Sequence, residues 1–233
     1  MIAAAGISSR RKAEELITGG RVKVNGAVVV KLGTRVDPRA DVIEVDGKKI
    51  YRDAGPRVYL LLNKPRGVIS SAYDPLGRPV VTDIVKGYKK RLFPVGRLDW
   101  DAEGALVLTN DGELTNRLIH PGFSVPKKYL VKVKGLPSEK ELKKIEKGVF
   151  LSDGKTLPAR VRFIKETREN SWIEIVVTEG RNRLIKRLLL AVGHPVLKLK
   201  RTEFAGLKVG KLKTGSFRAL REREVERLKK RWS

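Results

Sequence analysis

Three acidic residues, Asp99, Asp101 and Glu103, fall close together in the sequence beside Arg97. They precede an apolar run, residues 105–109, which is too short for a helix and is ended by the turn-forming sequence Asn-Asp-Gly. The run predicts a strand that is buried on both faces, and an acidic loop enters it. Spacing alone leaves two interpretations open: a solvated turn with an aspartate cap, or a carboxylate that is held for chemistry.

The chain is strongly basic. Its 51 Lys and Arg residues exceed its 26 Asp and Glu residues, which gives a formal net charge of +25. The excess runs through the whole chain among ordinary apolar segments, so the sequence predicts a folded protein with a positive surface. An anionic partner would offset the self-repulsion of that surface. Nucleic acid is the predicted partner, with steeply salt-dependent binding, and a membrane surface is the weaker alternative.

Composition excludes several kinds of site. The chain has no cysteine, which rules out disulfides, thiolate metal sites and a cysteine nucleophile. Its only histidines, His120 and His194, cannot form a histidine-rich metal site, and each lies beside a proline as a turn residue would. No apolar run approaches the roughly 18 residues of a membrane span, and no signal peptide is recognised. We therefore expect a soluble, cytoplasmic, monomeric protein without a metal.

The first part of the chain predicts a small module of one helix and a twisted sheet. Ser8 or Ser9 can cap a helix over residues 10–18, and Asn-Gly and Asp-Gly pairs at 25–26 and 46–47 predict hairpin turns. Three cations fill the first helical turn, where the helix dipole disfavours positive charge. The turn is either a binding site for phosphate or a solvated basic surface.

The rest of the chain alternates strands with amphipathic helices, which predicts an α+β fold. Strands are expected at residues 58–62, 128–134, 159–165 and 172–178. Tyr129 falls on the apolar face of the second of these strands. The predicted organisation is a module at 1–52, a linker at 53–57 and a larger domain at 58–233.

A further helix is predicted from the Gly-Arg-Asn-Arg sequence at residues 180–183 to residue 192. Arg183, Lys186 and Arg187 share one face of it, with no acidic residue among them. Three interpretations stay open for this face: a solvated surface, a site for RNA phosphate, or a partner for a buried carboxylate.

Two resemblances now become clear. The sequence I-S-S-R-R-K-A-E-E-L-I-T-G-G-R-V-K-V-N-G resembles an S4 RNA-binding domain. Such domains normally begin with a further helix, of which only residues 1–6 would remain here, so the start is either truncated or shortened.

The stretch G-R-L-D-x-D-x-E-G-x-L-x-L-T-N-D-G resembles the catalytic motif of the bacterial ribosomal RNA pseudouridine synthases of the RsuA/RluB type. The sequences L-N-K-P-R-G-V, D-P-L-G-R-P, K-K-Y-L-V-K-V-K-G, E-G-R-N-R and G-H-P-V-L-K-L-K-R follow in the expected order. The resemblance implies a catalytic domain with a long mixed, mainly antiparallel β-sheet flanked by helices. It also implies isomerisation of uridine to pseudouridine in ribosomal RNA, without a cofactor.

By this resemblance Asp99 is the catalytic aspartate, Tyr129 packs against the target base, and Lys186 pairs with Asp99. Asp101 and Glu103 are interpreted as structural residues that turn the loop and pair with nearby cations. The chain departs from the family pattern at Leu184, where glutamine is usual, and at Ala102, where threonine or serine is usual. The residues expected to contact RNA are basic and lie in the motif loops, on the predicted helix and in the first module: Arg97, Lys64, Arg66, Arg78, Arg183, Arg187, Arg10, Arg11, Lys12, Arg21 and Lys23.

The predicted substrate is 23S ribosomal RNA, because the motif variants look more like the large-subunit branch, with 16S as the alternative. Two other functions remain. One is a non-catalytic, ribosome-associated RNA-binding or assembly factor on the same fold. The other is a nucleoside hydrolase that uses Asp99 and Glu103 as a carboxylate pair. Whether the covalent step takes place at the sugar or at C6 of the base stays open.

Overall fold

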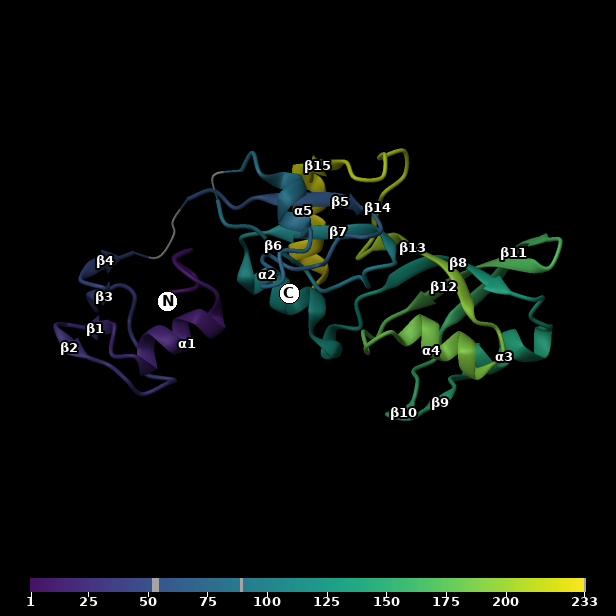
Figure 1. Ribbon diagram of the computed structural model, residues 1–233, viewed down its shortest axis with the longest axis horizontal. Coiled ribbons are helices and arrows are strands. Elements are labelled where there is room, and N and C mark those ends of the chain that lie inside the picture. Colours follow the sequence, from purple (N-terminus) through teal and green to yellow (C-terminus); the bar gives the residue numbers. More distant parts are fainter. Residues whose placement is uncertain (52–54, 89, 233) are drawn as a thin grey trace. The chain divides into compact units, whose positions relative to one another are not determined.

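The computed structural model describes residues 1–51, 55–88 and 90–232 (Figure 1). The chain divides into two compact units, Met1–Pro56 and Arg57–Ser233. The predicted boundary between the first module and the linker falls on residues 52–54, which lie outside the described residues.

The first unit is a helix and a four-stranded antiparallel sheet. Helix α1 (Arg10–Thr18) is capped by Ser9, whose hydroxyl accepts from Lys12 N at 3.1 Å. Both predicted hairpin turns are present, and all four of their central residues have positive φ, as a type I′ turn requires. The sheet order is β2-β1-β3-β4, formed by β1 (Val22–Val24), β2 (Ala27–Val28), β3 (Ile43–Val45) and β4 (Lys48–Ile50).

The segment before α1 is folded as consecutive turns. Ala5 N donates to Met1 O at 2.9 Å, and Ile7 N donates to Ile2 O at 3.3 Å. Ile2 is buried in the small core of this unit beside residues of α1 and the sheet. These residues therefore contribute packing to the unit, although they form no helix.

The second unit is built on a nine-stranded sheet with the order β11-β12-β8-β13-β7-β5-β15, to which β14 and β6 add at β13 and β7. The pairing of β13 with β7 is parallel, and the other strand pairs of this sheet are antiparallel. The predicted mixed, mainly antiparallel α+β fold is thereby confirmed. The strands are β5 (Tyr59–Lys64), β6 (Phe93–Pro94), β7 (Glu103–Thr109), β8 (Lys127–Lys134), β11 (Arg160–Thr167), β12 (Asn170–Val177), β13 (Val196–Phe204), β14 (Leu207–Lys208) and β15 (Phe217–Ala219).

Both faces of the sheet are covered at β7, which explains the continuous apolar run of this strand. Leu106 and Leu108 pack in one core with α4 (Leu184–Ala191). Ala105 and Val107 pack in a second core with α2 (Gly112–Ile119) and α5 (Glu222–Arg231). The remaining elements are α3 (Glu139–Lys147), a small hairpin of β9 (Phe150–Leu151) and β10 (Gly154–Lys155), and the 3₁₀ segments Val81–Val85 and Pro121–Phe123.

The helix predicted from residues 180–183 is shorter than expected, which is a correction. It begins at Leu184, and Arg183 caps it in the left-handed conformation with φ 49°. The Gly-Arg-Asn-Arg sequence is therefore a loop, and only Lys186 and Arg187 of the three predicted cations lie within the helix.

Gly104 permits the close approach of the two parallel strands. It has φ +114°, and a Cβ added there would lie 2.1 Å from Arg201 O of β13. We expect Gly104→Ala to lower the free energy of unfolding by about 3 kcal/mol through overpacking and a strained φ. For a domain of this size that is a fall of roughly 6–12 °C in Tm.

Thermal denaturation of the purified variant checks this prediction. Gly112→Ala is the matched control, because a Cβ added at Gly112 meets nothing within 4 Å. Equal Tm values for the two variants would contradict the proposed steric role of Gly104.

Candidate active site

A cavity of about 150 Å³ lies where the loop before β7 meets β8, β13 and the start of α4. Asp99 and Tyr129 both line it. The side chain of Asp99 is 32% exposed, and Tyr129 is buried in the sheet at 8% exposure. The apolar part of the wall includes Leu98, Ala102, Leu118, Leu184, Ile185 and Leu199. The structure thus brings a partly exposed carboxylate and an aromatic side chain to one largely apolar space.

The loop that carries Asp99 is held by hydrogen bonds to its backbone. Ala102 N donates to Asp99 O at 3.1 Å, which closes a turn. Ser70 Oγ donates to Leu98 O at 2.9 Å and accepts from Leu98 N at 3.0 Å. These bonds fix the backbone on both sides of the carboxylate.

Lys64, at the end of β5, supplies the strongest restraint on this loop. Its Nζ donates to Pro65 O at 3.0 Å, Asp99 O at 3.1 Å and Ala102 O at 2.9 Å. All three protons of an ammonium group are thereby used. The residue is fully buried. The expectation that Lys64 contacts RNA is therefore wrong: β5 continues to this residue, and its side chain points under the acidic loop.

Burial lowers the pKa of the Lys64 amine to about 8, against the attraction of Asp101 and Asp99. In the unfolded chain a lysine keeps its proton to about pH 10.4. Between these values the unfolded state binds more protons than the folded state, so stability rises with pH. We expect Tm to increase from pH 8 to about pH 10, with a smaller increase in Lys64→Met.

Differential scanning calorimetry at pH 7.5, 8.5 and 9.5 would measure this slope. Lys127, whose pKa burial also lowers to about 8, should leave part of the slope in the variant. A wild-type Tm that is flat or falls over this range would contradict the account of Lys64.

Lys186, on α4, contacts two carboxylates of the acidic loop. Its Nζ lies 2.5 and 2.6 Å from the two oxygens of Asp101 and 3.6 Å from Asp99 Oδ2. The predicted pairing of Lys186 with Asp99 is present as an ion pair, but the hydrogen bonds go to Asp101. The hydrogen bond from Lys186 holds the pKa of Asp101 below its usual range. Glu103 pairs with Lys200 of β13 at 3.7 Å.

Three further cations, which were not among the predicted site residues, line the cavity: Lys127, Arg181 and Arg201. Lys127 Nζ donates to Val125 O at 2.8 Å and Thr178 O at 3.1 Å. Arg201 is 2% exposed, its Nε donates to Ala105 O at 2.7 Å, and its guanidinium lies 4.8 Å from the centre of the Phe204 ring. Strand alternation could have indicated Arg201, because it falls two residues after the buried Leu199. The cavity is consequently positive behind its apolar wall.

Comparisons with known proteins show to which family this chain belongs. Residues 58–191 match the family described as RNA pseudouridylate synthase. The chain belongs to this family. Residues 1–43 match the S4 domain, so both resemblances inferred from motifs are confirmed.

Relatives extend over nearly the whole chain. The ribosomal large subunit pseudouridine synthase B of Bacillus subtilis (strain 168) is 50% identical over 231 residues, or 98% of this chain and 93% of that protein. An uncharacterized RNA pseudouridine synthase of Aquifex aeolicus (strain VF5) is 45% identical over 96% of this chain and 90% of that protein. A crystal structure of a pseudouridylate synthase superposes with a TM-score of 0.68 at 27% identity, covering 97% of this chain and 96% of that one.

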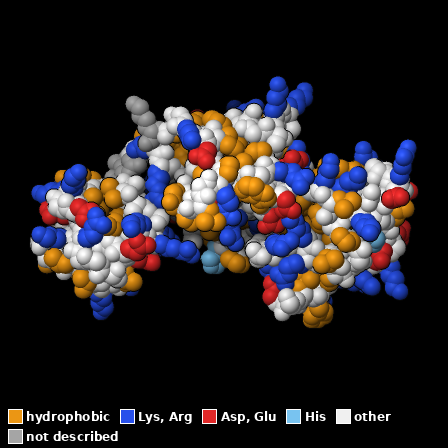
Figure 2. Space-filling view, viewed as in Figure 1, with side chains coloured by type: hydrophobic (Ala, Val, Ile, Leu, Met, Phe, Trp, Pro, Cys, Tyr) orange, Lys and Arg blue, Asp and Glu red, His pale blue; other side chains and the backbone are white. Residues whose placement is uncertain are grey.

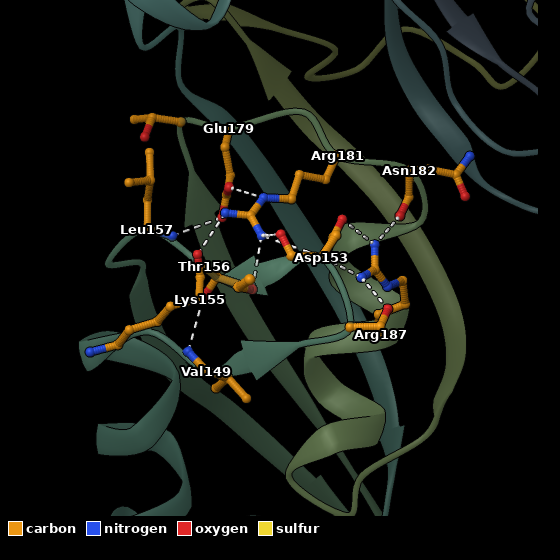
Figure 3. A network of polar contacts seen from close by, with 12 residues as sticks. Val149, Asp153, Lys155, Thr156, Leu157, Glu179, Arg181, Asn182 and Arg187 are labelled. Carbon is orange, nitrogen blue, oxygen red and sulfur yellow. Dashed lines mark hydrogen bonds and ion pairs between the residues drawn. The ribbon is translucent and has the colours of Figure 1, made fainter.

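In this pseudouridine synthase, the partly exposed Arg187, which was predicted to contact RNA, forms an ion pair within the protein. Figure 3 shows Arg181 and Arg187 pointing toward Asp153 in the β9–β10 hairpin. Arg187 forms an ion pair with Asp153. Arg181 pairs with Asp153 at 3.5 Å and with Glu179 at 2.7 Å. Arg181 further donates to Gly154 O and Lys155 O. The network attaches the hairpin to the loop that precedes α4.

The other predicted RNA contacts are more accessible. Arg97 and Arg183 are exposed and line the cavity beside Asp99, and Arg66 is exposed in the loop that follows β5. Arg78 is exposed and pairs with Asp74 at 2.7 Å. In the first unit, all five predicted cations are exposed, two of them in ion pairs: Arg10, Arg11, Lys23, Lys12 with Glu15, and Arg21 with Asp46. Figure 2 shows how widely such cations cover the visible face of each unit.

The two departures from the family pattern have packing roles, and the two histidines form hydrogen bonds with nearby backbone atoms. Leu184 and Ala102 are buried in the core around the cavity. His120 Nδ1 accepts from Gly122 N at 3.1 Å, and His194 Nδ1 lies 2.8 Å from Lys134 O. Within residues 1–51, 55–88 and 90–232, no group of three potential metal ligands occurs. None of the helices that the structure describes is both long and apolar enough to cross a membrane.

Proposed function

We propose that the protein converts uridine to pseudouridine in ribosomal RNA of the large subunit, with Asp99 as the nucleophile and without a cofactor. The observation that carries the proposal is the shared cavity of Asp99 and Tyr129, with Lys186 3.6 Å from the carboxylate. The name of the Bacillus subtilis relative, together with the +25 net charge, supports the choice of substrate.

The reaction is an isomerisation. The bond between N1 of uracil and C1′ of ribose breaks, the base turns over, and a bond forms between C5 and C1′. The proton on C5 leaves and N1 gains one, so atoms and electrons balance without an oxidant or reductant. An ionised carboxylate is a suitable nucleophile, attacking either C1′ or C6 of the base. Asp99 would carry this role.

The other cavity residues would support the nucleophile and the base. Desolvation disfavours an ionised carboxylate, and a neighbouring cation such as Lys186 favours it. A uridine stacked in RNA must be flipped out at a cost of a few kcal/mol. Stacking on Tyr129 would offset about 1–3 kcal/mol of that cost. Basic residues of both units, including Arg97 and Arg183, would bind phosphates.

We also propose that the protein acts in the cytoplasm as a monomer and that the first unit binds ribosomal RNA as S4 domains do. Two rival functions predict different outcomes when the protein is incubated with RNA. A non-catalytic assembly factor would leave every uridine unchanged, and a nucleoside hydrolase would release free uracil.

Incubation with separate 23S and 16S transcripts, followed by digestion and chromatography of the nucleosides, tests the proposal. The expected result is pseudouridine in the 23S transcript and no free uracil. Conversion of the 16S transcript alone would overturn the large-subunit assignment, and free uracil without pseudouridine would overturn the isomerase.

A further inference from the structure

A second cavity opens beside the first and shares part of its wall. It measures about 580 Å³, and Arg97, Leu98 and Asp99 line both cavities. Its remaining wall comes from Ile69, Ser70, Arg78, Trp100 and Asn182. A group bound there would lie next to a base bound against Asp99. The volume is in the range of sites that hold small organic ligands, about 300–1,000 Å³.

Trp100 presents a large aromatic surface to this second cavity. It is 49% exposed, although a tryptophan of a folded domain is usually mostly buried. Its backbone is fixed, because Gly67 N donates to Trp100 O at 2.9 Å. Its ring lies against the same loop, since a Cβ added at Gly67 would be 3.8 Å from Cζ2. An exposed ring on a restrained backbone is suited to stack on a nucleobase.

The charges around Trp100 favour a nucleotide over a neutral apolar ligand. Arg97 and Arg78 line the cavity, and both are exposed. The ion pair with Asp74, whose side chain is 6% exposed, positions the Arg78 guanidinium. Asn182 adds an exposed amide that can donate or accept. Asp99 is the single carboxylate among the described lining residues.

We propose that this second cavity binds the nucleotide adjacent to the target uridine, with its base stacked on Trp100 and its phosphate against Arg97 and Arg78. The inference rests on the proposed function, because it takes the first cavity as the site of the target base. Stacking tolerates any base, whereas the amide of Asn182 supplies a hydrogen-bonding group that distinguishes base edges. Trp100 then contributes to holding the flipped strand beside the target.

Kinetics with Trp100→Leu and Trp100→Phe test the stacking. We expect the leucine variant to lower kcat/KM for pseudouridine formation in ribosomal RNA by about 10- to 100-fold, as the loss of one stacked base predicts. The phenylalanine variant should stay within about threefold of wild type, because it keeps an aromatic face. Tyr73→Leu is the control, since Tyr73 is a 76% exposed aromatic of a nearby loop that is not among the residues of either cavity wall. Wild-type kinetics in the leucine variant, or equal losses in both Trp100 variants, would overturn the inference.

A binding measurement tests the same contact without catalysis. The Asp99→Asn protein is titrated with ribosomal RNA, and acrylamide quenching of its tryptophan fluorescence is compared with that of the double variant Asp99→Asn/Trp100→Leu. We expect RNA to reduce quenching in the first protein and to change it little in the second. Unchanged quenching in both would overturn the inference even if the wild type forms pseudouridine. Protection of Trp100 without any pseudouridine in the wild-type reaction would overturn the proposed function and retain the nucleotide site.

Discussion

Replacement of Asp99 by asparagine is expected to lower the rate of pseudouridine formation by on the order of 10³-fold or more, while RNA binding stays within a few-fold of wild type. An amide has nearly the shape of the carboxylate but lacks its negative charge and its nucleophilicity. The loop backbone should persist, because Lys64 and Ser70 bind main-chain atoms of the loop and not the Asp99 side chain. Tritium release from ribosomal RNA labelled at C5 of uridine measures the rate, since C5 loses its hydrogen in the reaction.

Asp101→Asn is the matched control for this experiment. Asp101 lies two residues away and binds Lys186, but it is not among the residues that line either cavity. We expect it to retain at least about a tenth of the wild-type rate, because it acts only through Lys186. A larger loss of rate in Asp101→Asn than in Asp99→Asn would show that Asp99 is the wrong carboxylate for the nucleophile.

Replacement of Lys186 by methionine is expected to lower kcat by about 100-fold with little change in KM. The side chain of Lys186 is 17% exposed, and its ammonium lies near both Asp99 and Asp101. Without it, both carboxylates lose the cation that favours their ionised forms in a partly desolvated site. Methionine keeps most of the volume and the packing of the stem.

The split between kcat and KM identifies the role of Lys186. Lys186→Arg should recover a substantial part of the rate, because it restores the cation. Lys200→Met, which removes the ion pair with Glu103 at 3.7 Å, is the control and should leave kcat near wild type. A raised KM at unchanged kcat in Lys186→Met would show that this lysine holds RNA and does not serve Asp99.

Much of the fold follows from local patterns in the sequence. The buried strand at β7 was predictable because an apolar run of that length between turn signals fits a strand covered on both faces. The inward position of Tyr129 followed from alternation in β8. The start of α4 was placed four residues too early, because the basic loop before Leu184 has no residue that breaks a helical pattern except its first glycine.

The site was harder to predict, because it depends on contacts between distant segments. Lys64 precedes a proline and a basic loop, so it resembled a surface residue. Only the pairing of β5 with β7 brings it under the Asp99 loop. Likewise, no local pattern says that Lys186 should hydrogen-bond Asp101 more closely than Asp99, because α4 and the acidic loop are more than 80 residues apart. The chemistry-bearing residue types and the pairing of Lys186 with Asp99 were thus expected from the sequence, but the contacts of Lys64 and the hydrogen bonds from Lys186 to Asp101 were not.

Site-resolved mapping of pseudouridine in 23S and 16S ribosomal RNA, after incubation with wild-type protein and with Asp99→Asn, tests the central claim most directly. The account predicts conversion of one or a few 23S uridines by the wild type and none by the variant. Conversion of the same uridines by Asp99→Asn would contradict the role of Asp99 as the nucleophile. Binding of ribosomal RNA by both proteins without any conversion would contradict the proposed enzymatic activity. The protein would then be an RNA-binding factor.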